Sequence, residues 1–93
     1  MSTVEEIIAL GWRGQSKGSR AVLEERSVVL CIYIGMLGPV LEDECRLMQT
    51  APINKALSQR RIDLALALDK LDKVINADKV INAELTRRGG LND

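Results

Sequence analysis

The stretch from Gly11 to Arg20 gathers the residues best suited to bind a small molecule. It places Trp12, the only tryptophan, beside Arg13 and adds Lys17, three glycines and no acidic residue. An indole face can stack on a nucleobase while Arg and Lys bind phosphate, and glycines let backbone N–H groups approach an anion. The stretch therefore predicts a site for a small anionic ligand. The alternative is that Trp12 covers the core beneath a solvated basic loop.

A second basic cluster, Lys55 with Arg60 and Arg61, lies at the expected start of the last helix. Cations are unfavourable at a helix N-terminus because of the helix dipole, which favours a role with a partner. A solvated helix face is the alternative. If the two clusters meet across a subunit boundary, they would line one anionic pocket.

The side chains of a catalytic centre are missing from this sequence. There is no histidine, which removes the usual general base and the commonest metal ligand. Cys31 and Cys45 alone argue against zinc and are typical of reduced, buried thiols. The carboxylates at 42–44 would point about 100° apart on a helix, which suits a solvated acidic turn better than a metal. We therefore predict a protein that is not an enzyme and has no cofactor.

Length and composition favour one helical domain over residues 1–93. The chain is 46% hydrophobic, and its 13 basic residues balance 13 acidic ones, which argues against binding DNA or RNA. The opening Met-Ser-Thr-Val-Glu-Glu lacks the charged and apolar regions of a secretory signal. We therefore expect a cytoplasmic protein.

The pattern of the chain predicts an all-α fold, since no segment alternates strictly between apolar and polar residues. A capping box of Ser2 with Glu5, or of Thr3 with Glu6, opens a short N-terminal helix that Gly11 ends. A loop over 11–18 follows. Ser19 is then a suitable N-cap for a helix that runs from residue 20 to about residue 37.

A run of fourteen uncharged residues, 28–41, dominates the middle of the chain. A helix that is apolar on every face has to be surrounded, and a chain this small cannot easily surround it. The run therefore predicts a homo-oligomer. It is too short to cross a membrane, which needs about 20 apolar residues, and Gly38-Pro39 interrupts it. This pair either kinks one helix or separates two, the second over 39–49.

The last part of the chain predicts one long helix from about Pro52 or Ser58 to Arg88, ended by Gly89-Gly90. It carries apolar residues spaced as in a coiled-coil seam, with Asp78 and Asn82 in or beside that seam as polar residues that fix register. With the apolar run, this stripe gives the predicted oligomer interface: Val29, Ile32, Tyr33, Leu64, Leu68, Leu71 and Ile75.

The segment Leu-Ala-Leu-Asp-Lys-Leu-Asp at 66–72, preceded by Arg60-Arg61 and followed by Val-Ile-Asn-Ala at 74–77, resembles the C-terminal helix of small phage proteins. Those proteins are cyclic-oligonucleotide sponges that act against CBASS immunity. The resemblance implies an all-helical homo-oligomer in which an N-terminal aromatic stacks on a base. It implies that Trp12-Arg13 is that position, and that Arg26 with Arg60 or Arg61 grips phosphate.

Two functions follow from these patterns. In the first, a helical homo-oligomer sequesters a cyclic nucleotide of antiviral immunity without turning it over. Trp12 stacks on a base, while Arg13, Lys17 and Arg60 or Arg61 neutralise phosphate. In the alternative, the protein is an interaction module of phage or mobile-element type, an antiactivator or inhibitor. Its long helix would then offer an apolar stripe to a host protein, and Trp12 would anchor the interface.

Overall fold

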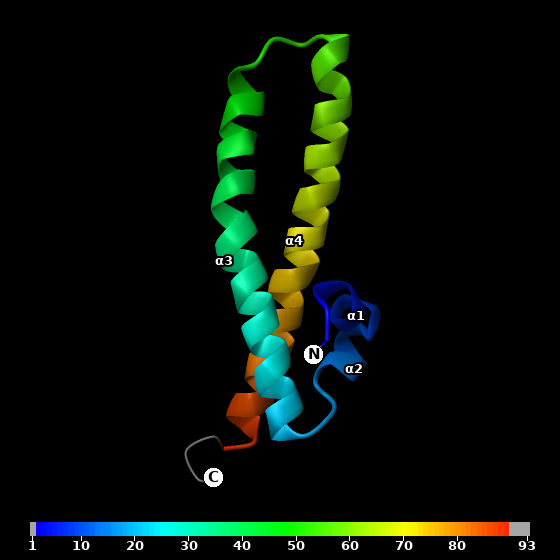
Figure 1. Ribbon diagram of the computed structural model, residues 1–93, viewed down its shortest axis with the longest axis vertical. Coiled ribbons are helices and arrows are strands. Elements are labelled where there is room, and N and C mark those ends of the chain that lie inside the picture. The colour runs from blue at the N-terminus through cyan, green and yellow to red at the C-terminus, as the bar shows by residue number, and fades with distance from the viewer. Residues whose placement is uncertain (1, 90–93) are drawn as a thin grey trace.

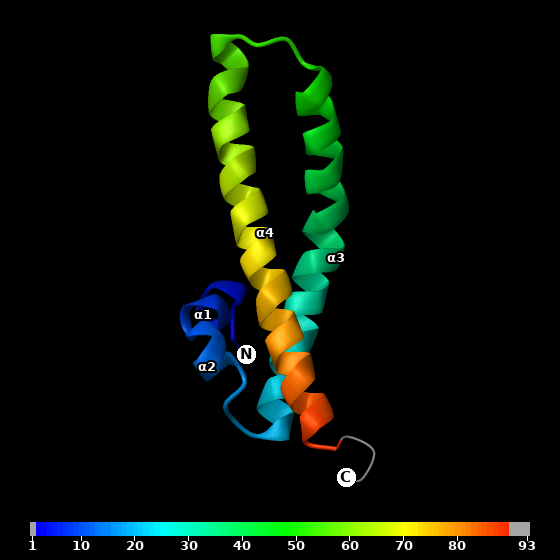
Figure 2. The ribbon, with the colours of Figure 1, turned by 180° about the vertical axis from the view of Figure 1, so that it is seen from behind.

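A computed structural model describes residues 2–89, which form four helices and no strand. The helices are α1 (Val4–Ala9), α2 (Gly11–Gln15), α3 (Arg20–Thr50) and α4 (Lys55–Arg87). The two long helices, α3 and α4, form an antiparallel hairpin in a molecule of 56 × 22 × 19 Å (Figure 1). The segment 51–54 joins them at the tip, and α1 and α2 lie beside the opposite end (Figure 2). The predicted all-helical fold with a long C-terminal helix is confirmed.

Side-chain caps explain where three of the helices begin. The Thr3 hydroxyl accepts a hydrogen bond from the Glu6 backbone N–H (3.2 Å), and the Glu6 carboxylate accepts one from the Thr3 N–H (3.4 Å). This is the predicted capping box in its second register. Ser19 caps α3 as expected, by accepting from the N–H of residue 22. Asn54 caps α4 by accepting from the N–H of residue 57 (3.0 Å), a cap that the sequence analysis did not assign.

The segment 11–18 is only partly the loop that we predicted. The first helix ends before Gly11, as expected, but Gly11–Gln15 then forms α2. Gly11 has a φ of 71°, a conformation that glycine adopts at little cost, and it turns the chain between the two short helices. Gln15 is buried. Packing of α2 against α4 therefore overrides the glycine-rich local sequence, and the loop shrinks to 16–19.

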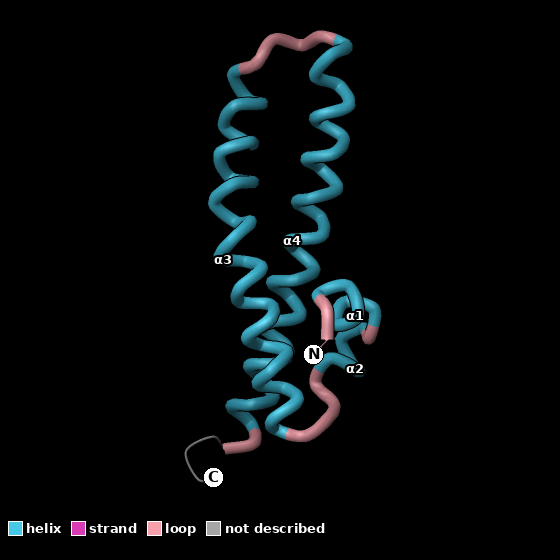
Figure 3. Tube along the Cα trace, in the orientation of Figure 1, coloured by secondary structure: helices cyan, strands magenta, loops and turns pink. Residues whose placement is uncertain are grey.

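Gly38-Pro39 does not divide the central segment. The helix α3 continues through Pro39 to Thr50, so of the two alternatives left open by the sequence the structure has one helix and not a separate one over 39–49 (Figure 3). Pro39 has no N–H to donate to the Gly35 carbonyl, which costs a helix about 3 kcal/mol. Because Pro39 is exposed and the space beside Gly35 is open, water can reach that carbonyl. Packing along α4 keeps the helix intact.

The core lies at the end of the hairpin where α1 and α2 pack. Its buried side chains are Ile7, Leu23, Leu30, Val74, Ala77 and Ile81. Among the described residues of the tip half, only Leu41 is buried. The uncharged run is therefore not enclosed within one chain: Val28, Ile32, Met36 and Val40 are all more than half exposed. None of the described helices combines the length and the apolarity needed to cross a bilayer.

A polar cluster lies in the seam between the two long helices. The Ser27 hydroxyl is within hydrogen-bonding distance of the Asp78 carboxylate (3.4 Å) and the Asn82 side-chain carbonyl (3.3 Å). The Cys31 thiol lies 3.8 Å from the same Asp78 oxygen. Asp78 and Asn82 thus face α3 of their own chain, as polar seam residues that favour one register of the hairpin. The predicted long helix itself ends at Arg87; Gly90 lies outside the described residues.

Candidate functional site

Trp12 forms one wall of an open hollow between α2 and α4. Its indole is 67% exposed, so most of the ring faces solvent. The hollow has a volume of about 360 Å³, which is in the range of small-molecule sites. Its other lining residues are an apolar set (Ile8, Ala77 and Val80) and a polar set (Gln15, Lys73 and Asn76). An aromatic face, amides and a cation therefore share one cavity.

Two cations flank this hollow. The Arg13 guanidinium lies 5.1 Å from the centre of the Trp12 ring, at cation–π distance. The Lys73 ammonium pairs with the Asp69 carboxylate (3.1 Å), but both side chains are more than half exposed, so the pair is weak. Neither Arg13 nor Lys17 forms an ion pair with a described residue. An anion in the hollow would therefore meet cations that no strong internal pair occupies.

Arg26 holds the end of α2 in place. Its guanidinium Nη1 donates to the backbone carbonyls of Lys17 (2.7 Å), Gln15 (3.1 Å) and Gly14 (3.4 Å). Carbonyls at the end of a helix lack a partner within it, so Arg26 caps α2 from α3. The resemblance implied that Arg26 grips phosphate. The structure instead places its Nη1 on the backbone, where it positions the helix that carries Trp12.

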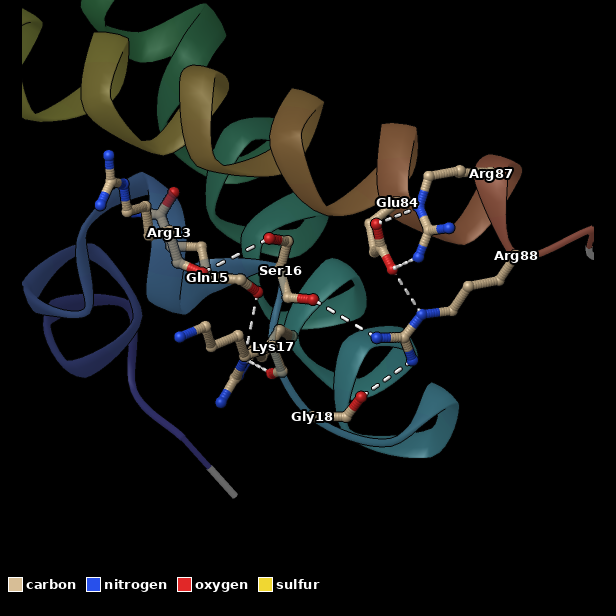
Figure 4. A network of polar contacts seen from close by, with 9 residues as sticks. Arg13, Gln15, Ser16, Lys17, Gly18, Glu84, Arg87 and Arg88 are labelled. Carbon is tan, nitrogen blue, oxygen red and sulfur yellow. Dashed lines mark hydrogen bonds and ion pairs between the residues drawn. The ribbon is translucent and has the colours of Figure 1, made fainter.

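Arg88 grips the same loop from the end of α4, a contact that the sequence analysis missed. Its guanidinium donates to the carbonyls of Gly18 (2.8 Å) and Ser16 (3.5 Å) and pairs with the Glu84 carboxylate (2.7 Å) (Figure 4). Arg87 also pairs with Glu84 (2.6 Å). Hydrogen bonds from Arg87 and Arg88 lower the pKa of Glu84 to about 2. The i,i+4 spacing of Glu84 and Arg88 was the one available signal.

Lys70 fixes α1 on the hairpin. Its ammonium lies 2.6 Å from the Glu5 carboxylate and 5.5 Å from the centre of the Tyr33 ring. The hydrogen bond from Lys70 to Glu5 lowers the pKa of the Glu5 carboxyl group and raises the pKa of the Lys70 ammonium group. A second open hollow, of about 390 Å³, lies beside this pair and shares Ile8 and Lys73 with the first. The contact therefore helps to position the α1 side of the site.

The second basic cluster lies near the tip of the hairpin. Arg60 pairs with Glu44 (3.0 Å), and Arg61 donates to the carbonyls of Met48 and Ala51 (3.3 Å each), which end α3. Twelve residues of α4 separate Arg61 from the hollow residue at 73, or about 18 Å at ~1.5 Å per residue. One chain therefore does not bring Arg60 and Arg61 to Trp12. Their place in a shared pocket across a subunit boundary stays a prediction.

The seven residues predicted to form an oligomer interface divide into three groups. Val29 and Tyr33 pack against the core of their own chain. In contrast, Ile32 is 56% exposed and Leu68 is 36% exposed. The remaining three residues lie half-buried along α4: Leu64, Leu71 and Ile75. Their part in an oligomer stays a prediction.

The hollow beside Trp12 holds groups that bind rather than groups that react: a ring, two amides and cations. Among residues 2–89, no cluster of three Cys, Asp or Glu side chains is arranged to hold a metal ion. No protein-family model, curated protein or solved structure matches this chain.

Proposed function

We propose that the protein is a helical homo-oligomer that binds and sequesters a small anionic ligand without turning it over. The ligand that we propose is a cyclic nucleotide of the kind that signals in antiviral immunity. The observation that carries this proposal is the exposed Trp12 indole on the wall of a polar-lined hollow, with Arg13 against the ring and Lys73 opposite. A base needs a stacking face and a phosphate needs cations, and both are present.

The aromatic, polar and basic side chains in and beside the hollow each have a role in this proposal. Trp12 stacks on a base, Arg13 and Lys73 neutralise phosphate, and the amides of Gln15 and Asn76 hydrogen bond to base edges. Lys17 adds charge at the end of α2. The carbonyl grips of Arg26 and Arg88 keep α2 in place before the ligand arrives. A pre-organised site spends less binding energy on ordering itself.

Thermal unfolding with cyclic di- and trinucleotides tests the proposal. A ligand at ~100 times its dissociation constant adds about 2.7 kcal/mol to the free energy of unfolding, a clear rise in Tm. Trp12→Ala should lose this rise while its Tm without ligand stays near that of the wild type, because the indole is mostly exposed. The matched control is Ile62→Ala, which removes another exposed apolar side chain, 54% exposed.

Two results would contradict the ligand site. One is a wild-type Tm that no cyclic nucleotide raises. The other is a ligand-dependent rise that Trp12→Ala keeps in full. Unfolding of Trp12→Ala without ligand would show instead that the indole stabilises the fold, and the site would then lose its main support.

The second candidate is an interaction module that binds a host protein, as an antiactivator or inhibitor does. The observation that favours it is the exposed tip, where Ile53 is 91% exposed and Leu47 is 58% exposed. Large apolar side chains exposed together at one end of a molecule can serve as contacts for a partner. A host protein recovered with the wild-type chain would be purified and titrated against Ile53→Asp. Full-affinity binding by that variant would exclude the tip as its contact surface.

A further inference from the structure

One face of the hairpin is covered at one end and open at the other. On α3, Val29 and Tyr33 are half-buried against the core. The same helix face continues, in steps of three, four and seven residues, to Met36, Val40 and Leu47, which are 70%, 54% and 58% exposed. The helices α1 and α2 lie beside only the half of the hairpin that is opposite the tip (Figure 2). No other described helix lies beside the tip half.

We call the three exposed side chains Met36, Val40 and Leu47 the α3 ridge. A groove lies beside this ridge. A hollow of about 220 Å³ lies between the two long helices, with an apolar floor of Leu41, Leu64 and Ala67 and a charged rim of Glu44, Arg60 and Asp63. Ala67 lies one heptad before Val74, which belongs to the same buried cluster as Ile7 of α1. The open half therefore presents a seam like the one that α1 covers in the closed half.

We propose that the tip half of a second copy covers this face, so that two hairpins pack as an antiparallel four-helix dimer. A two-fold interface needs a ridge and a groove on the same chain, because each copy offers both to the other. This chain has both, side by side. The proposal rests on the homo-oligomer proposed above and assigns its interface; it does not depend on the identity of the ligand.

The charges around the face fit a second copy better than a strongly charged partner. The groove rim carries Arg60 and Asp63, and beside the α3 ridge lie Asp43 and Arg46, with side chains 72% and 71% exposed. The groove rim and the surroundings of the α3 ridge thus each carry positive and negative side chains, and the chain has no net charge. Arg60 pairs with Glu44 (3.0 Å) and Arg46 with Asp43 (3.7 Å) within one chain, at mostly exposed positions where ion pairs are weak. In an antiparallel pair the cations of one copy can therefore also face the acids of the other, whereas a partner of one sign would meet like charges.

The size of the open face predicts a weak, reversible dimer. About fourteen residues of each helix lie beyond the part covered by α1, or roughly 21 Å at ~1.5 Å per residue. Two helices each about 10 Å wide give a footprint on the order of 400 Å² per copy, below the roughly 800 Å² per partner of a standard interface and in the range of transient contacts. The dimer should therefore dissociate on dilution.

Sedimentation equilibrium of the full chain at several concentrations tests this interface. The wild type should approach twice the chain mass of 10.3 kDa. Val40→Asp should weaken the dimer by about a hundredfold or more, because an unpaired carboxylate would be buried at the contact. The matched control is Val28→Asp: Val28 is 53% exposed, against 54% for Val40, but lies about 120° around the helix. It should leave the mass unchanged.

Each outcome has a distinct meaning. A wild type that stays at 10.3 kDa overturns both this interface and the homo-oligomer of the proposed function. An oligomer that Val40→Asp leaves intact, or that Val28→Asp dissociates equally, keeps the homo-oligomer but overturns this face. Circular dichroism confirms that each variant is folded. Leu47→Glu, a second change on the α3 ridge, replaces Val40→Asp if that variant loses helicity, and the same readings apply.

Discussion

The guanidinium of Arg88 donates a 2.8 Å hydrogen bond to the carbonyl of Gly18, a residue 70 positions earlier in the chain. The loop that follows α2 is thus held from the end of α4, while Arg26 of α3 holds it from the other side. Both arginines hold this loop through its backbone carbonyls. The position of Trp12 therefore depends on the register of the whole hairpin.

Arg88→Ala should loosen this loop and lower the free energy of unfolding by about 1–2 kcal/mol, because charge-assisted hydrogen bonds to two carbonyls are lost. Arg87→Ala is the matched control, since Arg87 also pairs with Glu84 but, within residues 2–89, forms no hydrogen bond with the loop. Urea unfolding gives the free energies, and the fluorescence anisotropy of Trp12 reports the mobility of α2. Equal effects of the two changes would contradict the grip on the loop.

Stability should fall as the pH drops below about 5. Arg87 and Arg88 lower the pKa of Glu84 from 4.5 to about 2, so the folded chain holds this carboxylate ionised where the unfolded chain protonates it. The contribution is complete above pH 4.5 and is lost as the pH falls through about 2. Glu84→Gln should flatten the dependence of the unfolding free energy on pH in this range. A slope that matches the wild type would refute this assignment.

Pro39→Ala should stabilise the protein by about 1–3 kcal/mol, because it restores an N–H donor for the Gly35 carbonyl inside a helix. Pro52→Ala is the natural control, since Pro52 lies in the segment between α3 and α4, where an added donor completes no helix. Chemical denaturation compares the two. If Pro39→Ala gains no more than Pro52→Ala, the missing hydrogen bond does not limit α3.

Asp78→Leu should raise the free energy of unfolding by about 1 kcal/mol, because an apolar side chain packs better in a helical seam than a carboxylate does. It should also remove the preference for one register that Ser27 and Asp78 provide, which would broaden the amide signals in NMR spectra of α3 and α4. Asp72→Leu, at an exposed position, serves as the control. A destabilised Asp78→Leu with sharp signals would contradict the register role.

Local signals in the sequence were sufficient for the starts of α1 and α3. Thr3 and Ser19 cap helices through hydrogen bonds to residues three positions away, and such contacts need no knowledge of the fold. Gly11–Gln15 was misread as loop, and the sequence left two alternatives open at Pro39, for the complementary reason. Their local chemistry disfavours a helix, but packing against α4 decides the outcome, and a single sequence does not display that packing.

The arginines show a second limit of sequence reasoning. Arg26 and Arg61 have the side chain expected of a phosphate ligand, yet each donates to carbonyls at the end of a helix. Those carbonyls are nine to thirteen residues away in sequence. Residue type alone therefore indicated what these groups can bind, and only the fold indicates what they do bind. Trp12 is different, because the fold leaves its ring exposed.

The grip of Arg88 on residues 16–18 also has a consequence for synthesis of the protein. Translation makes Trp12 before α4, so a nascent chain that ends short of α4 lacks both the Lys73 side of the hollow and the contact to Gly18. The hollow therefore forms only after α4 has been synthesised. Chains truncated before Lys73 should lack the hollow beside Trp12 altogether.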